Sequence, residues 1–213
     1  MNILELRALR GPNRYSRRPC IFMSLDIGSL EEAPSNKIPG FTERLLNLIP
    51  SLKDHRCSVG KPGGFIERLR QGTWVGHIVE HVALELQCLA GMELGFGKTF
   101  DTSTPGVYSV VYRYLVESAG IYAGSCAVDL IEAVIKSEDF DIDKVIFQLV
   151  QKREQDMLGP STASIVDEAK RRGIPSIRLN DSSFVQKKKK KKKKKKQTTI
   201  THQTHTLPLE IPT

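Results

Sequence analysis

The segment at 76–87, GHIVEHVALELQ, decides how the rest of the chain is interpreted. Apolar residues occupy most of its circumference when it is drawn as a helix, and a helix of that kind is normally buried in a protein core. At 100° per residue, its polar side chains lie at about 0°, −60°, +40° and +80° and form a single stripe. They are His77, Glu80, His81 and Glu85. We therefore predict a buried central helix over 75–89.

The residues around this segment predict the remaining elements. Thr73 is a residue type that caps helix N-termini, and Gly91 stands where the helix would end. Strands are predicted at 3–9, 20–25, 107–116 and 174–179, and helices at 41–49, 65–70, 119–135, 142–157 and 163–171. Because strands come early and helices cluster later, we expect a single compact domain of the α+β class.

Two glycine-rich segments interrupt the regular pattern. They are CSVGKPGG at 57–64 and GFGKT at 95–99. Neither has the spacing GxxxxGK[ST] or GxGxxG that cradles a nucleotide phosphate. We interpret both as tight turns and predict no ATP site in this chain.

The polar stripe of the central helix favours a metal site. Two imidazoles and two carboxylates near a core need partners, because an unpaired buried charge is strongly destabilising. His77 and His81 lie one turn apart and can both bind zinc. Glu80 can then hold a water molecule and take its proton, as the catalytic base of a hydrolase. The order H-x-x-E-H is that of the inverted zincins.

The third metal ligand is not fixed by the pattern. Cys57 is favoured, because it opens a glycine-rich loop that can approach the helix closely, while Glu85 and Glu67 are alternatives. Two simpler interpretations stay open. His–Glu pairs at helical spacing also form ordinary ion pairs, and Cys57 is equally well explained as a buried thiol.

The charge of the chain is concentrated in its tail. The whole chain of 213 residues has a formal net charge of +8, but 187–196 are ten consecutive lysines. Without these and the following segment, 1–186 holds 22 basic and 23 acidic residues, a net charge of −1. We therefore predict no specific nucleic-acid partner for the folded part. Low complexity predicts a disordered lysine-rich tail at 187–213, of unrelated sequence, that reads as the product of a frame slip.

Nothing in the sequence indicates export or a membrane. The N-terminal segment lacks an apolar core of the signal-peptide type, and we find no run of the ~18–20 apolar residues that cross a bilayer. The four cysteines are widely spaced, and those outside the glycine-rich loop are expected in the core: Cys20, Cys88 and Cys126. We therefore expect a cytoplasmic protein with reduced thiols.

Several blocks of the chain resemble the N-terminal domain of cyanophycin synthetases. The resemblance covers 1–186 in order and is carried by LRGPNRYS at 9–16, PSNKIPGFTERLLNLIPSL at 34–52, HRCSVGKPGGFIERLRQGTWVGHIVEHVALELQCLAGM at 55–92, GFGKTFDTSTPGVYSVVYRY at 95–114 and GPSTASIVDEAKRRGIPSIRL at 159–179. His77, Glu80 and His81 stand in the matching positions, and Cys57 begins the matching loop.

The resemblance implies a function and a domain organisation. The family makes cyanophycin, a poly-aspartate with arginine on each side chain, through ATP-grasp and Mur-ligase-like domains that follow the N-terminal domain. It implies an N-terminal domain at 1–158 and, at 159–186, the start of a segment leading to an ATP-grasp domain, after which this chain is truncated. The N-terminal domain is expected to hold the polymer and to join a homotetramer, and in some members it carries a metallopeptidase-like site.

Two functions therefore compete. In the first, the domain is a zinc-dependent hydrolase that cuts cyanophycin. In the second, it is a non-catalytic module for polymer binding and oligomerisation. Ligase activity is expected only of a full-length synthetase, whereas both functions agree on cyanophycin as the partner.

Overall fold

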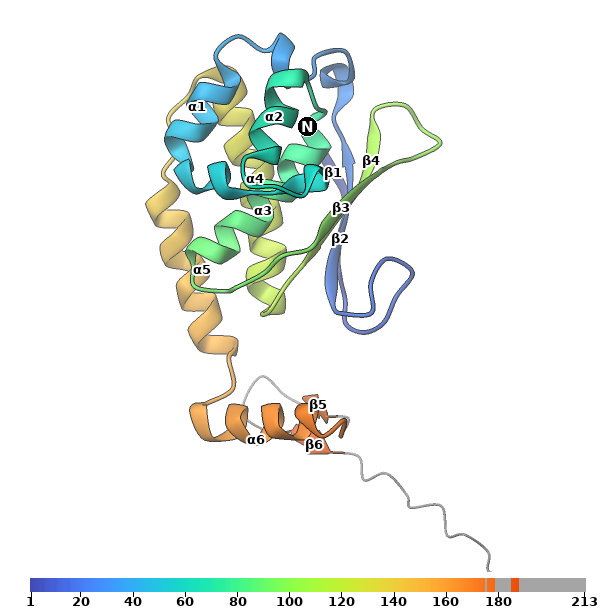
Figure 1. Cartoon of the computed structure of the whole chain (residues 1–213), viewed down its shortest axis with the longest axis vertical. Helices are drawn as coiled ribbons and strands as arrows, with labels where there is room; N and C mark the ends of the chain where they lie inside the picture. Colours follow the sequence, from blue (N-terminus) through green and yellow to red (C-terminus); the bar gives the residue numbers. More distant parts are fainter. Residues whose placement is uncertain (175, 179–184, 188–213) are drawn as a thin grey trace, which may run out of the picture. The chain divides into compact units, whose positions relative to one another are not determined.

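The computed structural model describes residues 1–174, 176–178 and 185–187. The chain divides into two compact units, Met1–Leu158 and Gly159–Thr213. The first unit combines one antiparallel sheet with helices, which confirms the predicted α+β class. Figure 1 shows these helices gathered on one face of the sheet.

The sheet has four antiparallel strands, and their spatial order differs from their order in the chain. It consists of β1 (Asn2–Leu9), β2 (Cys20–Asp26), β4 (Val107–Arg113) and β3 (Gly97–Asp101), in that spatial order and with all neighbours antiparallel. The helix-facing side of β2 supplies Ile21, Met23 and Leu25, which are fully buried in the main core. The opposite face carries a smaller cluster around Phe22, on which Tyr15 stacks at 5.8 Å between ring centroids.

Strand β3 corrects the sequence prediction, because residues 97–99 were expected in a tight turn. They belong instead to an edge strand that pairs only with β4, with Thr99 opposite Val110. An edge strand with one exposed border needs no alternating run of apolar residues. The sequence GKTFD therefore lacks the period-two pattern by which the other strands were recognised.

Five helices cover the inner face of the sheet. They are α1 (Phe41–Leu48), α2 (Gly64–Gln71), α3 (Val75–Leu89), α4 (Glu117–Lys136) and α5 (Ile142–Asp156). Helix α3 packs on β3 and β4, α4 packs on β1 and β2, and the two helices pack against each other. Short 3-10 turns connect the elements on the α1 and α2 side: Gly28–Glu32, Ser35–Lys37, Pro50–Asp54 and Cys57–Val59.

Helix α3 is the buried central helix that the sequence predicted. Twelve of its fifteen residues are buried, and Gly91, with φ of +78°, ends it in the left-handed conformation that glycine tolerates. The predicted N-cap was wrong. The N-cap position belongs to Trp74, and no side chain caps the helix. The hydroxyl of Thr73 lies 2.9 Å from Nδ1 of His77 instead, so it serves an imidazole and not the helix backbone.

Helix α4 corrects the statement that no run reaches membrane-spanning length. Its 20 residues are long and apolar enough to cross a bilayer by length and composition alone. In the structure, 61% of its most apolar window is buried inside the protein, where it packs against α3, α5 and the sheet. This packing accounts for its apolar character.

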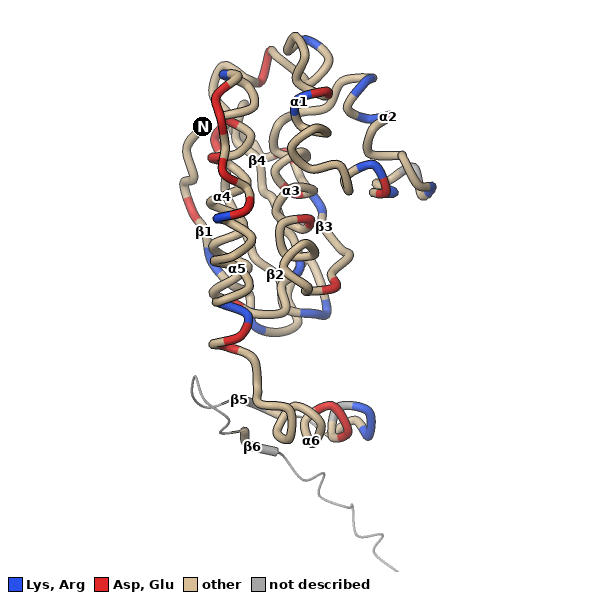
Figure 2. The backbone as a smooth tube through the Cα atoms, turned by 90° about the vertical axis from the view of Figure 1, so that its left-hand side faces the viewer, with Lys and Arg blue, Asp and Glu red and all other residues tan. Residues whose placement is uncertain are grey.

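The second unit is small in its described part. It contains α6 (Pro160–Arg171) and an antiparallel pair of β5 (Ser176–Arg178) and β6 (Val185–Lys187). The lysine-rich tail predicted at 187–213 lies outside the described residues, apart from Lys187 at the end of β6. In the first unit, acidic and basic residues are both spread over many elements (Figure 2), in keeping with the near-neutral charge of 1–186.

Candidate metal centre

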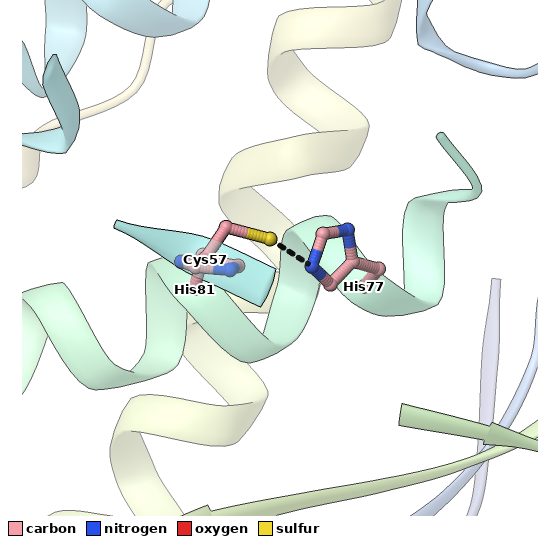
Figure 3. A group of neighbouring side chains, drawn as sticks. All are labelled: Cys57, His77 and His81. Carbon is pink, nitrogen blue, oxygen red and sulfur yellow. Dashed lines mark hydrogen bonds between the residues drawn. The ribbon is translucent and has the colours of Figure 1, made fainter. Parts of the chain in front are cut away.

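Three predicted ligands meet beside α3. One donor atom each from Cys57, His77 and His81 lies within 4.8 Å of the others. The closest pair is Sγ of Cys57 and Nε2 of His77, 3.3 Å apart (Figure 3). Two histidines one helical turn apart and a cysteine from a distant loop therefore form one cluster, as the sequence analysis favoured.

The position of Cys57 is set by a strained turn. Cys57 has φ of +52°, one of two non-glycine residues with positive φ in the described part of the chain, and Gly60 and Gly63 follow with φ of +78° and +82°. The turn is anchored at its far end by Phe65, whose ring stacks on that of His81 at 4.0 Å between centroids. Left-handed backbone at a non-glycine residue costs free energy and is typically retained where it positions a functional side chain.

Hydrogen bonds fix which nitrogen each imidazole offers to the cluster. Nδ1 of His77 bonds the hydroxyl of Thr73 at 2.9 Å, which leaves Nε2 facing Cys57. Nδ1 of His81 lies 2.8 Å from Nδ1 of His55, and Nε2 of His55 lies 2.6 Å from Oε2 of Glu85. Ring nitrogens that bond each other must divide into one donor and one acceptor.

The Glu85 carboxylate determines this division. It can only accept, so His55 donates from Nε2, and a neutral His55 then accepts at Nδ1 from the Nδ1–H of His81. Nε2 of His81 is then the deprotonated nitrogen, which is the form that binds a metal. A carboxylate–imidazole–imidazole chain thus prepares His81 as a ligand.

The two alternative ligands have other partners. Glu85 is bound to His55 and is not in the three-residue cluster. Burial is the largest single effect and raises the pKa of Glu85, but the interactions with His55 and Ser51 together outweigh it, so the pKa is lowered. Glu67 lies on α2, is half exposed and pairs with Lys61 at 2.7 Å.

Glu80 lies on the sheet side of α3. Its Oε2 accepts a hydrogen bond of 2.8 Å from the hydroxyl of Thr99 on β3. Burial raises the pKa of Glu80 to about 7, and the bond from Thr99 only partly opposes this shift. A carboxyl group with a pKa near neutrality is suited to proton transfer at physiological pH.

The two imidazoles of the cluster are held neutral. Burial and the charge of Arg68 lower the pKa of His77 to about 4. Burial, followed by the neighbouring His77 and His55, lowers the pKa of His81 to about 2. Neutral imidazoles and a thiol form a nitrogen and sulfur donor set, which suits zinc better than magnesium or calcium.

The cluster opens into a cavity of about 840 Å³. Cys57, His77 and His81 line it, and so do Glu80 and its partner Thr99. The cavity is further lined by His55, Arg56, Ser58, Arg68, Thr73, Trp74, Leu84, Leu94, Gly95, Phe96, Gly97, Lys98, Phe100, Asp101 and Tyr108. Space for a substrate therefore adjoins both the donor cluster and the carboxyl group.

His55 and Thr73 are the site residues that the sequence analysis missed. His55 lies two residues before Cys57, so the presence of a third histidine near the loop was a usable signal. Nothing in the spacing shows that it reaches His81, which is 26 positions away. Thr73 was noticed, but for a role in capping.

Comparison with known proteins identifies the family. The sequence model of the cyanophycin synthase-like N-terminal domain matches residues 22–136, which is more than half of the chain and includes the whole donor cluster. The cyanophycin synthetase of Trichormus variabilis is 47% identical over 216 residues, spanning 99% of this chain and 24% of the relative. That of Synechocystis sp. is 50% identical over 191 residues, spanning 87% and 22%.

A third cyanophycin synthetase, from Geminocystis herdmanii, is 45% identical over 216 residues. The chain spans about a quarter of the length of the curated relatives it matches. With the match over 22–136 and these identities, the chain belongs to the cyanophycin synthase-like N-terminal domain family.

Proposed function

We propose that this domain is a zinc-dependent hydrolase that binds and cleaves cyanophycin. The observation that carries the proposal is the convergence of Cys57, His77 and His81 beside a cavity that also contains Glu80. A set of three protein donors with an adjacent carboxyl group is the arrangement of catalytic zinc sites, which keep one position open.

The residues divide into ligands and a base. Nε2 of His77, Nε2 of His81 and Sγ of Cys57 would hold the ion, because one donor atom of each residue lies within 4.8 Å of the others and Nδ1 of His81 is engaged by His55. When bound, zinc polarises a carbonyl group and lowers the pKa of water. Glu80 would accept a proton from water that attacks the amide carbon and deliver it to the leaving amine. Its pKa of about 7 allows both transfers near neutral pH.

Thr99 would control the Glu80 carboxyl group. The hydroxyl donates to Oε2, which leaves Oε1 for water. The hydrogen bond also opposes the effect of burial on the pKa of Glu80 and so favours the deprotonated form that acts as a base.

The family suggests the substrate. The relatives are cyanophycin synthetases, so we propose that the cavity admits this polymer of aspartate and arginine. Acidic groups of the domain would pair its guanidinium groups in bidentate fashion, and Asp101 at the cavity wall is placed for that role.

The experiment combines metal analysis with cleavage. Elemental analysis of the purified chain should show about one zinc per chain, and incubation with cyanophycin should shorten the polymer unless a chelator is present. Glu80→Gln should keep the zinc and lose cleavage. The control is Glu67→Gln, which removes an exposed carboxylate paired with Lys61 and should retain both properties. A chain that binds no zinc and leaves the polymer intact contradicts the proposal.

The second function would then remain. If the domain retains cyanophycin on a column without shortening it, it is a polymer-binding and oligomerisation module with no activity of its own. The relatives are named for the synthesis of cyanophycin and not for its cleavage, which favours keeping this alternative. Size-exclusion chromatography tests the predicted homotetramer in the same preparation.

The role of residues 159–186 and the location of the protein in the cell also remain predictions. We expect residues 159–186 to lead toward an ATP-grasp domain, and we expect the protein in the cytoplasm. Ligation of amino acids is proposed only for a full-length synthetase, since no ATP site is predicted in this chain.

A further inference from the structure

Arg68 is a partly buried cation that has no ion-pair partner among the described residues. It lies on α2, between the buried anchors Phe65 and Leu69. Its Nε is buried and forms no hydrogen bond, and no carboxylate of the described residues lies within the 4.0 Å of an ion pair. Buried polar groups are almost always hydrogen-bonded, so this nitrogen is an exception, and the guanidinium charge is not neutralised by any described carboxylate.

The side chain belongs to the wall of the cavity. Arg68 lines it together with His77 and Glu80. The unpaired guanidinium therefore lies next to the donor cluster and not on a remote surface of α2.

The charges around the cavity favour an anionic ligand. Its lining contains the cations Arg56, Arg68 and Lys98 and the two carboxyl groups of Glu80 and Asp101. Cations thus exceed anions before any metal binds, and a bound metal increases that excess.

We propose that Arg68 binds a carboxylate of the substrate and places the neighbouring amide bond at the metal cluster. The planar guanidinium matches a carboxylate through two parallel hydrogen bonds, and Arg68 lines the cavity without an ion pair to any described carboxylate. The inference rests on the proposed hydrolase function and specifies its substrate class: amides that have a free carboxylate close to the bond that is cut.

Cyanophycin contains such a group. An arginine joined through its amino group to an aspartate side chain retains its own carboxylate. Arg68 would bind this carboxylate, while Asp101, on the edge strand β3, is available to the guanidinium of the same substrate. With Arg68 on the carboxylate and Asp101 on the guanidinium, each aspartyl-arginine unit would bind in one orientation.

The test uses two synthetic oligomers of aspartate with side-chain arginine. In one the arginine carboxylates are free, and in the other they are carboxamides. We expect the zinc-loaded chain to cleave the free form at least ~10-fold more efficiently, as expected for a charge-assisted pair. Arg68→Gln should abolish this preference mainly through KM, and Arg68→Lys should restore part of it. The matched control is Arg70→Gln, which removes an exposed arginine from the same helix and should keep the preference.

Binding separates failure of this inference from failure of the hydrolase proposal. If neither oligomer is cleaved, the hydrolase proposal fails, and calorimetry of the zinc-loaded chain with the two oligomers still decides the role of Arg68. Tighter binding of the free carboxylate form, lost in Arg68→Gln but not in Arg70→Gln, supports the inference. Equal affinity for both oligomers, or equal losses in the two variants, overturns it. Thermal unfolding shows that each variant is folded.

Discussion

The substitution Gly97→Ala isolates the role of Glu80 without touching any ligand. Gly97 begins β3 and lies directly against the Glu80 side chain. A Cβ atom at this position would stand 2.5 Å from Cγ and 2.6 Å from Cδ of Glu80, closer than real Cβ atoms approach other atoms. The φ angle of Gly97 is not positive, so alanine fits the backbone and the conflict is confined to the carboxyl group.

The contact distance gives the size of the effect. Carbon atoms rest about 3.5–4 Å apart, so the Glu80 carboxyl carbon must move by about 1 Å. A displacement of about 1 Å in a catalytic group typically lowers the rate by about 10²-fold. Because the obstructed atoms are the end of a flexible side chain, the fold should survive. The atoms nearest to the added Cβ all belong to Glu80 and not to the donor cluster, so metal binding should be unchanged.

The assay compares Gly97→Ala with Gly95→Ala. An added Cβ at Gly95 meets nothing within 4 Å, so it controls for the loss of a glycine in the same segment. We expect wild-type zinc content in both variants, with kcat for cyanophycin cleavage reduced about 100-fold in Gly97→Ala alone. Unchanged kcat in Gly97→Ala, or loss of zinc together with activity, would refute the assignment of Glu80 as a base separate from the ligands.

Three further predictions concern the donor cluster. Glu85→Gln should weaken zinc binding about 10-fold or more in a chelator competition, because the carboxylate no longer fixes the tautomers of His55 and His81; unchanged affinity contradicts that chain of hydrogen bonds. Cys57→Ser should weaken zinc binding further than Glu85→Gln, and an equal or smaller effect would remove the thiol from the ligand set. The metal-free chain should lose stability as pH falls from about 6.5 toward 4, because His77 and His81 are protonated in the unfolded chain but stay neutral when they are buried in the folded chain. The variant His81→Phe should show a weaker dependence of its unfolding temperature on pH.

The central helix was predictable because its signal is local. The segment 75–89 is apolar around most of its circumference, and its burial, length and C-terminal glycine follow from its own residues. The same reasoning placed α1, α2 and α5 within a few residues of their observed bounds. Thr73 shows where local reasoning ends. Its residue type suits a cap, but the approach of His77 gives its hydroxyl a different partner.

The third donor depended on contacts that spacing does not contain. Glu85 shares the stripe with His77 and His81, and Cys57 is far from them in sequence, so helix geometry alone would favour the carboxylate. In the structure, His55 binds Glu85 and the left-handed turn at Cys57 brings the thiol to 3.3 Å from His77. The path of the loop before α2 brings Cys57, and not Glu85, close to His77. This path could not be predicted from the spacing of the residues.

The angular width of the stripe explains why the complete site needs two more elements. Glu80 and His81 are separated by about 100° around α3, so different elements pack against the two side chains, although both line the cavity. His81 faces His55 and Phe65, while Glu80 faces Thr99 and the glycine at 97. An H-x-x-E-H pattern thus becomes a site only if a loop supplies donors on one side and a sheet edge leaves room on the other. The glycine that allows Glu80 to approach β3 is therefore as necessary to the proposed chemistry as the histidines, although it bears no functional group.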